Sequence, residues 1–400
     1  MSASATAHGM SEARVKPDWP ALRLDEVRAL LRHFDGCGEP IEILSTSPRP
    51  FSAASVVSTK TGRVFVKRHH RSVRDRDGLL EEHRFLAHLH RHGAPVPRIF
   101  ATAAGETAIE MGDWTYEVHE APAGVDIYED ALSWTPFLCL AHAYAAGRAL
   151  GKLHRAAESY TAPPRPPRPL IASFTIFAAA DPSAGLRRYL QAHPALLLDA
   201  LTQRCSQEAL ALLSPFHARL QPLLPLLAPL WTHNDLHGSN ILWSAAGDHA
   251  EAAAIIDFGL ADRTYAVHDL AHTIERNIVE WLEIDADSAR IDNVPIHIDH
   301  LTALLDGYTS IRSLSDAELS ALAPMAALCH AEFALTEADY FAGVLHSDEN
   351  HRVCVEDYLV GRARWMRGPG GEKLLQAIEQ WALARNRRLP LATPQGVKES

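Results

Sequence analysis

A short stretch near the middle of the chain carries residues that could transfer a phosphoryl group. It holds His233, Asp235 and Asn240 in the spacing H-x-D-x-x-x-x-N, and Asp257-Phe258-Gly259 follows at the end of an apolar run. A hydroxyl that attacks the γ-phosphoryl of ATP needs a carboxylate to orient it and accept its proton, which suits Asp235. Asn240 offers a neutral oxygen and Asp257 a full negative charge to Mg²⁺. The two motifs therefore predict a catalytic base and two magnesium ligands.

A nucleotide-binding region is expected upstream, because such a centre must also hold the phosphates. The segment Arg63 to Lys67 has the pattern of a strand, and Lys67 at its end is the predicted phosphate lysine. The apolar spacing from Leu79 to Leu89 predicts a helix. Glu82 on this helix is the predicted partner of Lys67, and Glu81 is the alternative. A lysine or a glutamate at such a position can also be an ordinary solvated side chain. The assignment of Lys67 and Glu82 therefore rests on the order of the motifs along the chain.

This ordered set of residues resembles the aminoglycoside phosphotransferase family, which also takes in relatives of choline, homoserine and fructosamine kinases. The resemblance covers residues 40–345 and rests on these motifs: Lys67, Glu82, Gly93-Ala94-Pro95-Val96-Pro97, Gly151-Lys152-Leu153-His154, His233 to Asn240, Asp257-Phe258-Gly259 and Asp269-Leu270-Ala271. It implies an α+β, two-lobed protein-kinase-like fold, with a small β-rich N-terminal lobe and a large, mostly helical C-terminal lobe. It also implies ATP and Mg²⁺ as cofactors, Asp235 as the base, and Asn240 and Asp257 as metal ligands. His233 and Asp269 would then support the catalytic loop.

The chain departs from the family pattern in the loop that should cover the nucleotide. Between Ile43 and Val57 it has no glycine, so the G-x-G-x-x-G that lets backbone amides close on phosphates is missing. Small side chains still allow a close approach. The hydroxyls of Ser52 and Ser55 are the predicted donors to phosphate oxygens.

The resemblance and the composition together predict four regions. These are a mobile leader at 1–20, an N-terminal nucleotide-binding lobe at 21–120, a C-terminal catalytic and acceptor-binding lobe at 121–385, and a polar tail at 386–400. Near the lobe boundary, the backbone of Glu117, Val118, His119 and Glu120 is expected to meet the adenine edge. Pro163 to Pro169 predicts a surface loop.

Length and composition agree with a large two-lobed enzyme. The chain has 400 residues, which is more than a single hydrophobic core usually organises, and 47% of them are hydrophobic. No signal peptide opens the chain, and prolines and charges interrupt its most apolar stretch, residues 209–231, so no membrane span is expected. Five cysteines without a C-x-x-C pair predict reduced thiols in a cytoplasmic protein. Neither nucleic acid nor a membrane is an expected partner.

The chain contains 23 histidines, which raises the question of a metal-dependent hydrolase. His233, Asp235 and His237 alternate as metal ligands could, but a hydrolase would leave Asn240 and Lys67 unexplained. A second group of histidines near the predicted helix is expected to lie on solvated surface: His69, His70, His83, His88, His90 and His92.

Three function classes remain open: a small-molecule kinase, an atypical Ser/Thr protein kinase of the same fold, and a catalytically silent nucleotide-binding module. Retention of the base Asp235 argues against the silent module. Asp269-Leu270-Ala271 arrives ten residues after Gly259, with no A-P-E segment, which leaves no room for an activation loop. An ATP-dependent phosphotransferase that acts on a hydroxyl of a small molecule is therefore favoured.

The distribution of charge suggests what the acceptor carries. Residues 264–360 hold 18 Asp or Glu against 4 Lys or Arg, a balance of −14, whereas the whole chain has −11. Residues 63–98 instead hold 9 Lys or Arg against 4 acids. A basic lobe suits ATP and an acidic lobe suits a cation, although solvated helix surfaces are also acidic. We expect an amine-bearing acceptor, bound near the acids that follow the catalytic motifs: Glu275, Glu280, Glu283, Asp285 and Asp287.

Overall fold

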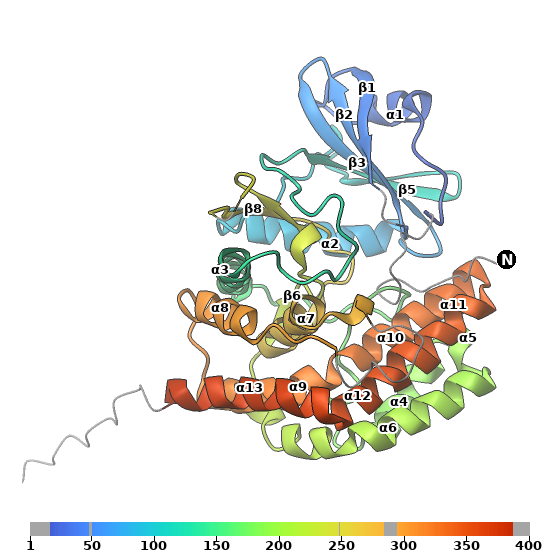
Figure 1. Ribbon diagram of the computed structural model, residues 1–400. Coiled ribbons are helices and arrows are strands. Elements are labelled where there is room, and N and C mark those ends of the chain that lie inside the picture. The colour runs from blue at the N-terminus through green and yellow to red at the C-terminus, as the bar shows by residue number, and fades with distance from the viewer. Residues whose placement is uncertain (1–16, 48–49, 248, 284–293, 387–400) are drawn as a thin grey trace, which may run out of the picture.

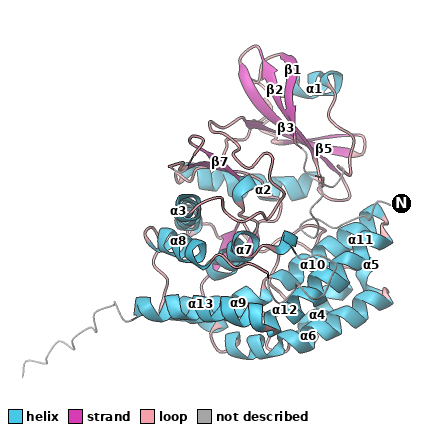
Figure 2. Ribbon diagram, in the orientation of Figure 1, coloured by secondary structure: helices cyan, strands magenta, loops and turns pink. Residues whose placement is uncertain are grey.

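The computed structural model describes residues 17–47, 50–247, 249–283 and 294–386. They form a small lobe built on a sheet and a larger helical lobe below it (Figures 1 and 2). The predicted α+β, two-lobed kinase-like fold is confirmed.

The N-terminal lobe contains a five-stranded antiparallel sheet with strand order β1-β2-β3-β5-β4. Its strands are β1 (Pro40–Thr46), β2 (Ala53–Thr59), β3 (Gly62–His70), β4 (Ala108–Met111) and β5 (Trp114–Glu120). The helix α1 (Leu24–Leu31) packs on one face, where its Val27 and Leu30 join Val57, Val66 and Val118 in a small core.

The two faces of this sheet have different roles, because side chains alternate along a strand. Val66 and Val118 point to the small core under α1. Lys67 and Glu117 are direct neighbours across β3 and β5 and take the opposite face. The phosphate lysine therefore points away from α1.

The helix α2 (Arg76–Arg91) belongs to the core of the larger lobe. Its Phe85 ring lies 5.3 Å from that of Trp231 and 5.9 Å from that of Phe258. Leu86 and Leu89 join the same large hydrophobic cluster. Figure 1 shows α2 between the sheet and the helical lobe. The helix α2 therefore connects the N-terminal lobe, which carries Lys67, to the segments around Trp231 and Phe258.

The C-terminal lobe is mostly helical. Its α-helices are α3 (Leu140–Ala157), α4 (Pro182–Ala192), α5 (Pro194–Leu197), α6 (Ala200–Leu220), α7 (Ala266–Ile278), α8 (Ile298–Thr309), α9 (Asp316–Leu328), α10 (His330–Tyr340), α11 (Asp348–Arg352), α12 (Arg362–Arg367) and α13 (Pro369–Asn386). The shorter 3₁₀ and π elements are η1 (Leu224–Leu226), η2 (Gly238–Asn240), η3 (Trp281–Glu283), η5 (Phe341–Leu345) and η6 (Val353–Gly361). Two strand pairs carry the catalytic loops: β6 (Pro229–Thr232) with β9 (Asp262–Tyr265), and β7 (Ile241–Trp243) with β8 (Ala252–Ile255).

Glycine sets the closest helix contact in this lobe. A Cβ on Gly147 of α3 would collide with the backbone oxygen of Leu304, and one on Gly307 of α8 would collide with that of Tyr144. Each helix thus places a glycine against the backbone of the other, which fixes α3 beside α8.

The predicted mobile leader needs a correction at its end. The Tyr340 hydroxyl donates to Asp18 at 2.8 Å, and the Trp19 ring stacks on His70 with centroids 4.7 Å apart. Asp18 and Trp19 therefore contact both lobes. The rest of the leader, to residue 16, and residues 387–400 of the tail lie outside the described residues.

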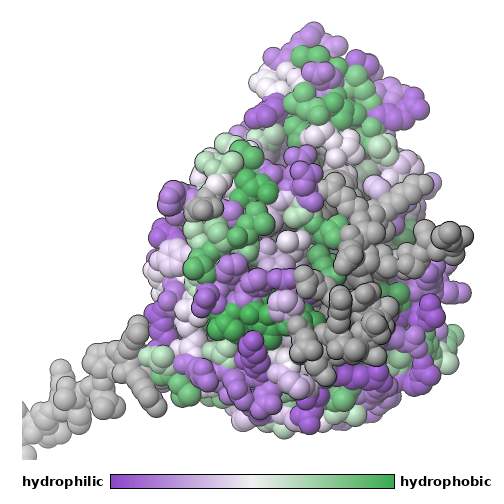
Figure 3. Space-filling model, viewed as in Figure 1, coloured by the Kyte–Doolittle hydropathy of each residue, from purple (hydrophilic) through white to green (hydrophobic). Residues whose placement is uncertain are grey.

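Among the described residues, one helical stretch is long and apolar enough to cross a membrane. It is Asp316–Leu345, with a mean hydropathy of 1.3, and 94% of its most apolar window is buried inside the protein. Such burial is typical of core helices. This stretch, rather than residues 209–231, is the one of membrane-spanning length. On the face seen in Figure 3, hydrophilic and hydrophobic side chains are interspersed.

Candidate active site

The catalytic loop follows β6 and is held from below by Asp269. The Asp269 carboxylate accepts the backbone N–H groups of His233 at 2.7 Å and Asn234 at 2.8 Å, and His154 at 3.0 Å. Burial alone would raise the pKa of Asp269, but the His154 contact holds it below its usual value. Asn234 adopts a left-handed φ of 62°, a strained conformation that occurs mostly at functional sites. The expected supporting role of Asp269 thus has a clear geometric basis.

Asp235 sits at the tip of this loop, with each carboxylate oxygen in contact with a donor. Arg276 Nε donates to Oδ1 at 2.6 Å, and Asn240 Nδ2 donates to Oδ2 at 3.2 Å. Burial raises the pKa of Asp235 and the charge of Arg276 opposes that rise. The carboxylate is oriented and ready to accept a proton.

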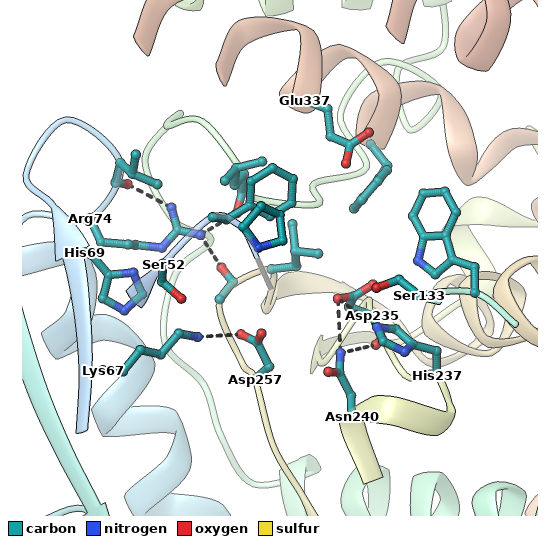
Figure 4. Close-up of a pocket in the computed structure, with 18 residues that line it drawn as sticks. Ser52, Lys67, His69, Arg74, Ser133, Asp235, His237, Asn240, Asp257 and Glu337 are labelled. Atoms are coloured by element: carbon teal, nitrogen blue, oxygen red, sulfur yellow. Dashed lines mark hydrogen bonds and ion pairs between the residues drawn. The ribbon is translucent and has the colours of Figure 1, made fainter. Parts of the chain in front are cut away.

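Asp257 lies next to Lys67 in the same cavity (Figure 4). Lys67 Nζ lies 2.8 Å from Asp257 Oδ1. Burial alone would raise the pKa of Asp257, but the Lys67 charge lowers it well below its usual value. Asp257 also has a left-handed φ of 64°. Because its pKa is lowered, Asp257 stays ionised, as a ligand of a hard cation must.

The side chains present fit a magnesium ion. Asn240 Nδ2 donates both to the Asp235 backbone oxygen at 2.9 Å and to the Asp235 side chain, so the amide oxygen Oδ1 is left for another partner. Asn240 and Asp257 line one cavity together with Lys67 and Asp235 (Figure 4). An amide oxygen and a carboxylate are ligands that Mg²⁺ prefers.

A family model described as the phosphotransferase enzyme family matches residues 49–294, which is more than half of the chain. The chain belongs to this family. A search of curated protein sequences gave no match.

Solved structures of this phosphotransferase family share the fold. An aminoglycoside phosphotransferase from Alicyclobacillus acidocaldarius is 16% identical with a TM-score of 0.52, over 93% of this chain and 99% of the other. A microcompartment-associated aminopropanol kinase is 17% identical with a TM-score of 0.55, over 87% and 99%. An amicoumacin kinase solved with AMP-PNP and Ca²⁺ is 15% identical with a TM-score of 0.53, over 85% and 93%.

The expected ion pair between Lys67 and Glu82 is wrong for this phosphotransferase. Glu82 accepts from Arg74 at 3.1 Å and from Arg165 at 3.3 Å. The alternative, Glu81, pairs with Arg165 as well, at 3.3 Å. The carboxylates of Glu82 and Glu81 are thus bonded to arginines, and Lys67 pairs with Asp257 instead.

The predicted loop at Pro163 to Pro169 is on the surface, with its prolines at 163, 164, 166 and 167 exposed, but Arg165 within it points into the protein. Its side chain is fully buried and donates to the carbonyl oxygens of Gly259 and Ala261, both at 3.1 Å. Arg74 donates to the same Gly259 oxygen at 2.6 Å. These guanidinium groups tie α2 to the Asp257-Phe258-Gly259 segment. Through Arg165, this surface loop helps to hold the segment that carries Asp257.

The structure separates the two predicted serine donors. Ser52 lines the cavity with Lys67. The Ser55 hydroxyl instead lies 3.2 Å from that of Thr46, on the α1 face of the sheet. Ser55 pairs across β2 and β3 with Val66, so strand alternation points it away from Lys67 and its assignment is wrong.

The nucleotide loop also contacts the helical lobe. The ring of Phe51, next to Ser52, lies 5.1 Å from that of Tyr340 at the end of α10.

The predicted adenine contact is also corrected. The Val118 carbonyl accepts from Phe100 at 2.8 Å and the Glu120 N–H donates to Arg98 at 2.8 Å, while Glu117 and His119 pair with β3. These backbone groups are engaged by neighbouring strands. The connection between the lobes starts only after Glu120.

Two functional side chains were missed by the sequence analysis. Arg276 of α7 is fully buried, with its guanidinium over the rings of Trp134 and Phe333 at 5.0 and 4.3 Å. Glu337 of α10 is buried and lines the cavity, and its carboxylate has no hydrogen-bond partner among the described residues. Burial raises the pKa of Glu337 well above its usual value. The helices α7 and α10 each carry three charged residues, all buried, so no local sequence pattern singles out Arg276 or Glu337.

The acids predicted near the acceptor are already paired or not described. Glu275 contacts Arg276 at 2.9 Å and also Arg362, and Glu280 contacts His297 at 2.5 Å. The Glu283 side chain, Asp285 and Asp287 lie outside the described residues. Neither Glu275 nor Glu280 lines the cavity that holds Asp235, so the structure does not support their assignment to the acceptor.

Proposed function

We propose that this protein transfers the γ-phosphoryl group of ATP to a hydroxyl of a small molecule. The observation that supports this best is the joint placement of a base and a phosphate-binding side in one cavity. Figure 4 shows Lys67 and Asp257 pointing toward each other, with Asp235 and Asn240 across from them. A binding module would need no base at this position.

Each side chain has a defined task in this reaction. Magnesium, held by Asn240 and Asp257, would neutralise charge on the phosphates. Asp235 orients the acceptor hydroxyl and takes its proton. Arg276 is a positioning residue that fixes the carboxylate of Asp235. Lys67 lies at the phosphate side of the same cavity.

The protein-kinase alternative has less support from the structure. After Gly259 the chain enters β9 at Asp262 and then α7 at Ala266 without an intervening loop. No segment is left there to bind a peptide substrate, so a small acceptor fits better.

The acceptor in this proposal carries a positively charged amine. Glu337 is a buried carboxylate that lines the cavity beside Trp134 and Phe333. An unpaired carboxylate is costly to bury, and an ammonium group would satisfy it while stacking on aromatic walls. The related aminoglycoside phosphotransferase and aminopropanol kinase are named for acceptors with amines.

The first experiment tests the phosphotransferase function. ATP turnover is measured with a panel of amino alcohols, aminoglycosides, sugars and amino acids, for the parent and for Asp235→Asn. The variant keeps the shape of the loop and should bind Mg·ATP normally, yet lose phosphoryl transfer by roughly 10²- to 10⁴-fold. Parent-like turnover of the acceptor by Asp235→Asn would reject Asp235 as the base.

The second experiment tests the amine. Glu337→Gln keeps the size of the side chain but cannot ionise when an ammonium group binds, so KM for an amine-bearing acceptor should rise by about 10-fold or more while Mg·ATP binding is unchanged. With an analogue that carries a hydroxyl in place of the amine, the parent and Glu337→Gln should have equal KM values. Glu372→Gln, an exposed acid on α13, is the control. Equal KM values for Glu337→Gln and the parent would show that the acceptor group lies elsewhere.

A further inference from the structure

We propose that the N-terminal lobe contains a transition-metal site, separate from the magnesium site, with His83, Glu117 and His119 as ligands. The ligand atoms of these three buried residues lie within 4.8 Å of one another. Glu117 Oε2 is 2.8 Å from His83 Nε2 and 2.7 Å from His119 Nε2. His69 completes this histidine cluster, because its Nε2 lies 3.0 Å from Glu117 Oε1.

The fold brings the cluster together from three elements. Lys67 pairs with Glu117 across β3 and β5, so His69 and His119, each two residues along, share the face of the sheet that α1 does not cover. The helix α2 supplies His83. These histidines are buried, as is His88, so the expectation of a solvated surface was wrong for His69, His83 and His88.

The chemistry of the cluster suits a borderline metal such as zinc. Imidazole nitrogens and one carboxylate oxygen are ordinary Zn²⁺ ligands, and nitrogen ligands disfavour Mg²⁺. At bonds of about 2.1 Å, tetrahedral ligand atoms lie about 3.4 Å apart, so the two short contacts to Glu117 must open by roughly half an ångström. Three ligands from side chains that already converge need only this small adjustment.

A supporting contact orients one ligand. His83 Nδ1 lies 2.8 Å from the Thr107 hydroxyl, which can hold the ring with its Nε2 toward Glu117. Metal-bound histidines normally have such a partner on their second nitrogen.

Three carboxylates lie near Lys67, namely Glu82, Glu117 and Asp257. Glu82 pairs with Arg74 and Arg165, and Asp257 pairs with Lys67 itself. Glu117 is the one carboxylate of this group without an arginine or lysine contact within ion-pair distance among the described residues.

The test uses the full chain without a histidine tag. Protein stripped of metal with a chelator is titrated with Co²⁺, which replaces Zn²⁺ and has strong visible absorption in tetrahedral sites. We expect one equivalent to bind with such a spectrum, to be displaced by Zn²⁺, and to withstand an excess of Mg²⁺. Binding of no stoichiometric metal by the parent would overturn the proposal and leave a hydrogen-bonded cluster only.

Variants locate the site. His83→Gln and His119→Gln should lose the tetrahedral spectrum, whereas His88→Gln, a buried histidine of α2 outside the cluster, should keep it. Thr107→Val keeps all ligands and should weaken binding by about 10- to 100-fold, so it remains informative if a ligand variant fails to fold. Unchanged metal binding in the variants of His83 and His119, or equal loss in His88→Gln, would reject the site.

Discussion

At the scale of single residues, Asp235 and Arg276 show what sequence can and cannot reveal. Asp235, Asn240 and Asp257 were predicted because the proposed chemistry requires those side chains at a short fixed spacing, and the structure places all three in one cavity. Arg276 follows Asp235 by 41 positions. Its contact depends on how α7 packs under the catalytic loop, and no local pattern encodes that direction.

The metal ligands should differ in their effect on nucleotide binding. Asp257→Ala removes an anionic ligand, whereas Asn240→Ala removes only a neutral oxygen, so the first should weaken Mg²⁺-dependent nucleotide binding more strongly. Titration calorimetry with Mg·ATP measures both. The same titrations with a chelator present provide the metal-free reference. Undiminished affinity in both variants would place the metal at other residues.

At the scale of elements, the interior contacts of α2 explain why one motif was misassigned. The pattern from Leu79 to Leu89 predicted the helix and Glu82 lies on it, as the structure confirms. Its partner could not be predicted, because Arg165 lies 83 positions away in a proline-rich loop that looks exposed. Strand alternation would have excluded Ser55, but only once the register of β2 and β3 was known.

Arg165 should matter far more for stability than its neighbour in the same loop. Arg165→Met removes one cation from two helix carboxylates and leaves the Gly259 and Ala261 oxygens without that donor, which should cost about 3–5 kcal/mol. Arg168→Met, whose side chain is part-exposed, should cost less than about 1 kcal/mol. Denaturant unfolding compares the two. Equal losses would contradict the role given to Arg165.

At the scale of the whole molecule, the lobes and their order could be predicted, but the residues that are buried in the core could not. Motif order and composition were sufficient for the two-lobed fold. The core of the helical lobe holds histidines and arginines that composition would place at the surface, among them His268, His272, Arg276, His330 and Arg362. Arg276 is accommodated by its bond to Asp235, and Arg362 by its ion pair with Glu275 and its position over the Trp281 ring, contacts that only the folded chain creates.

These buried histidines should make the fold sensitive to acid. Burial lowers the pKa of His268 to about 3 and that of His330 to about 4, from 6.5, and lowers that of His272 well below 6.5. The unfolded chain binds protons below pH 6.5 while the folded one does not, so stability is full above pH 6.5 and is lost as pH falls toward 4.

Urea unfolding between pH 5 and 7 measures this slope. His330→Gln should reduce the slope by up to about 1.4 kcal/mol per pH unit. His249→Gln, which replaces an exposed histidine, should leave the slope as in the parent. Because buried acids such as Asp18 and Asp262, whose pKa is raised to about 6, change the slope in the opposite sense, the test is the difference between variants. Equal slopes for His330→Gln and the parent would contradict the neutral state of that buried ring.

The contact between Phe51 and Tyr340 has a consequence for the kinetic order of the reaction. Phe51 belongs to the nucleotide loop, and Tyr340 ends the helix that carries Glu337. An acceptor that holds α10 therefore also steadies the loop above the phosphates. Nucleotide exchange would then be slowest while acceptor is present, and the phosphorylated product would leave before ADP.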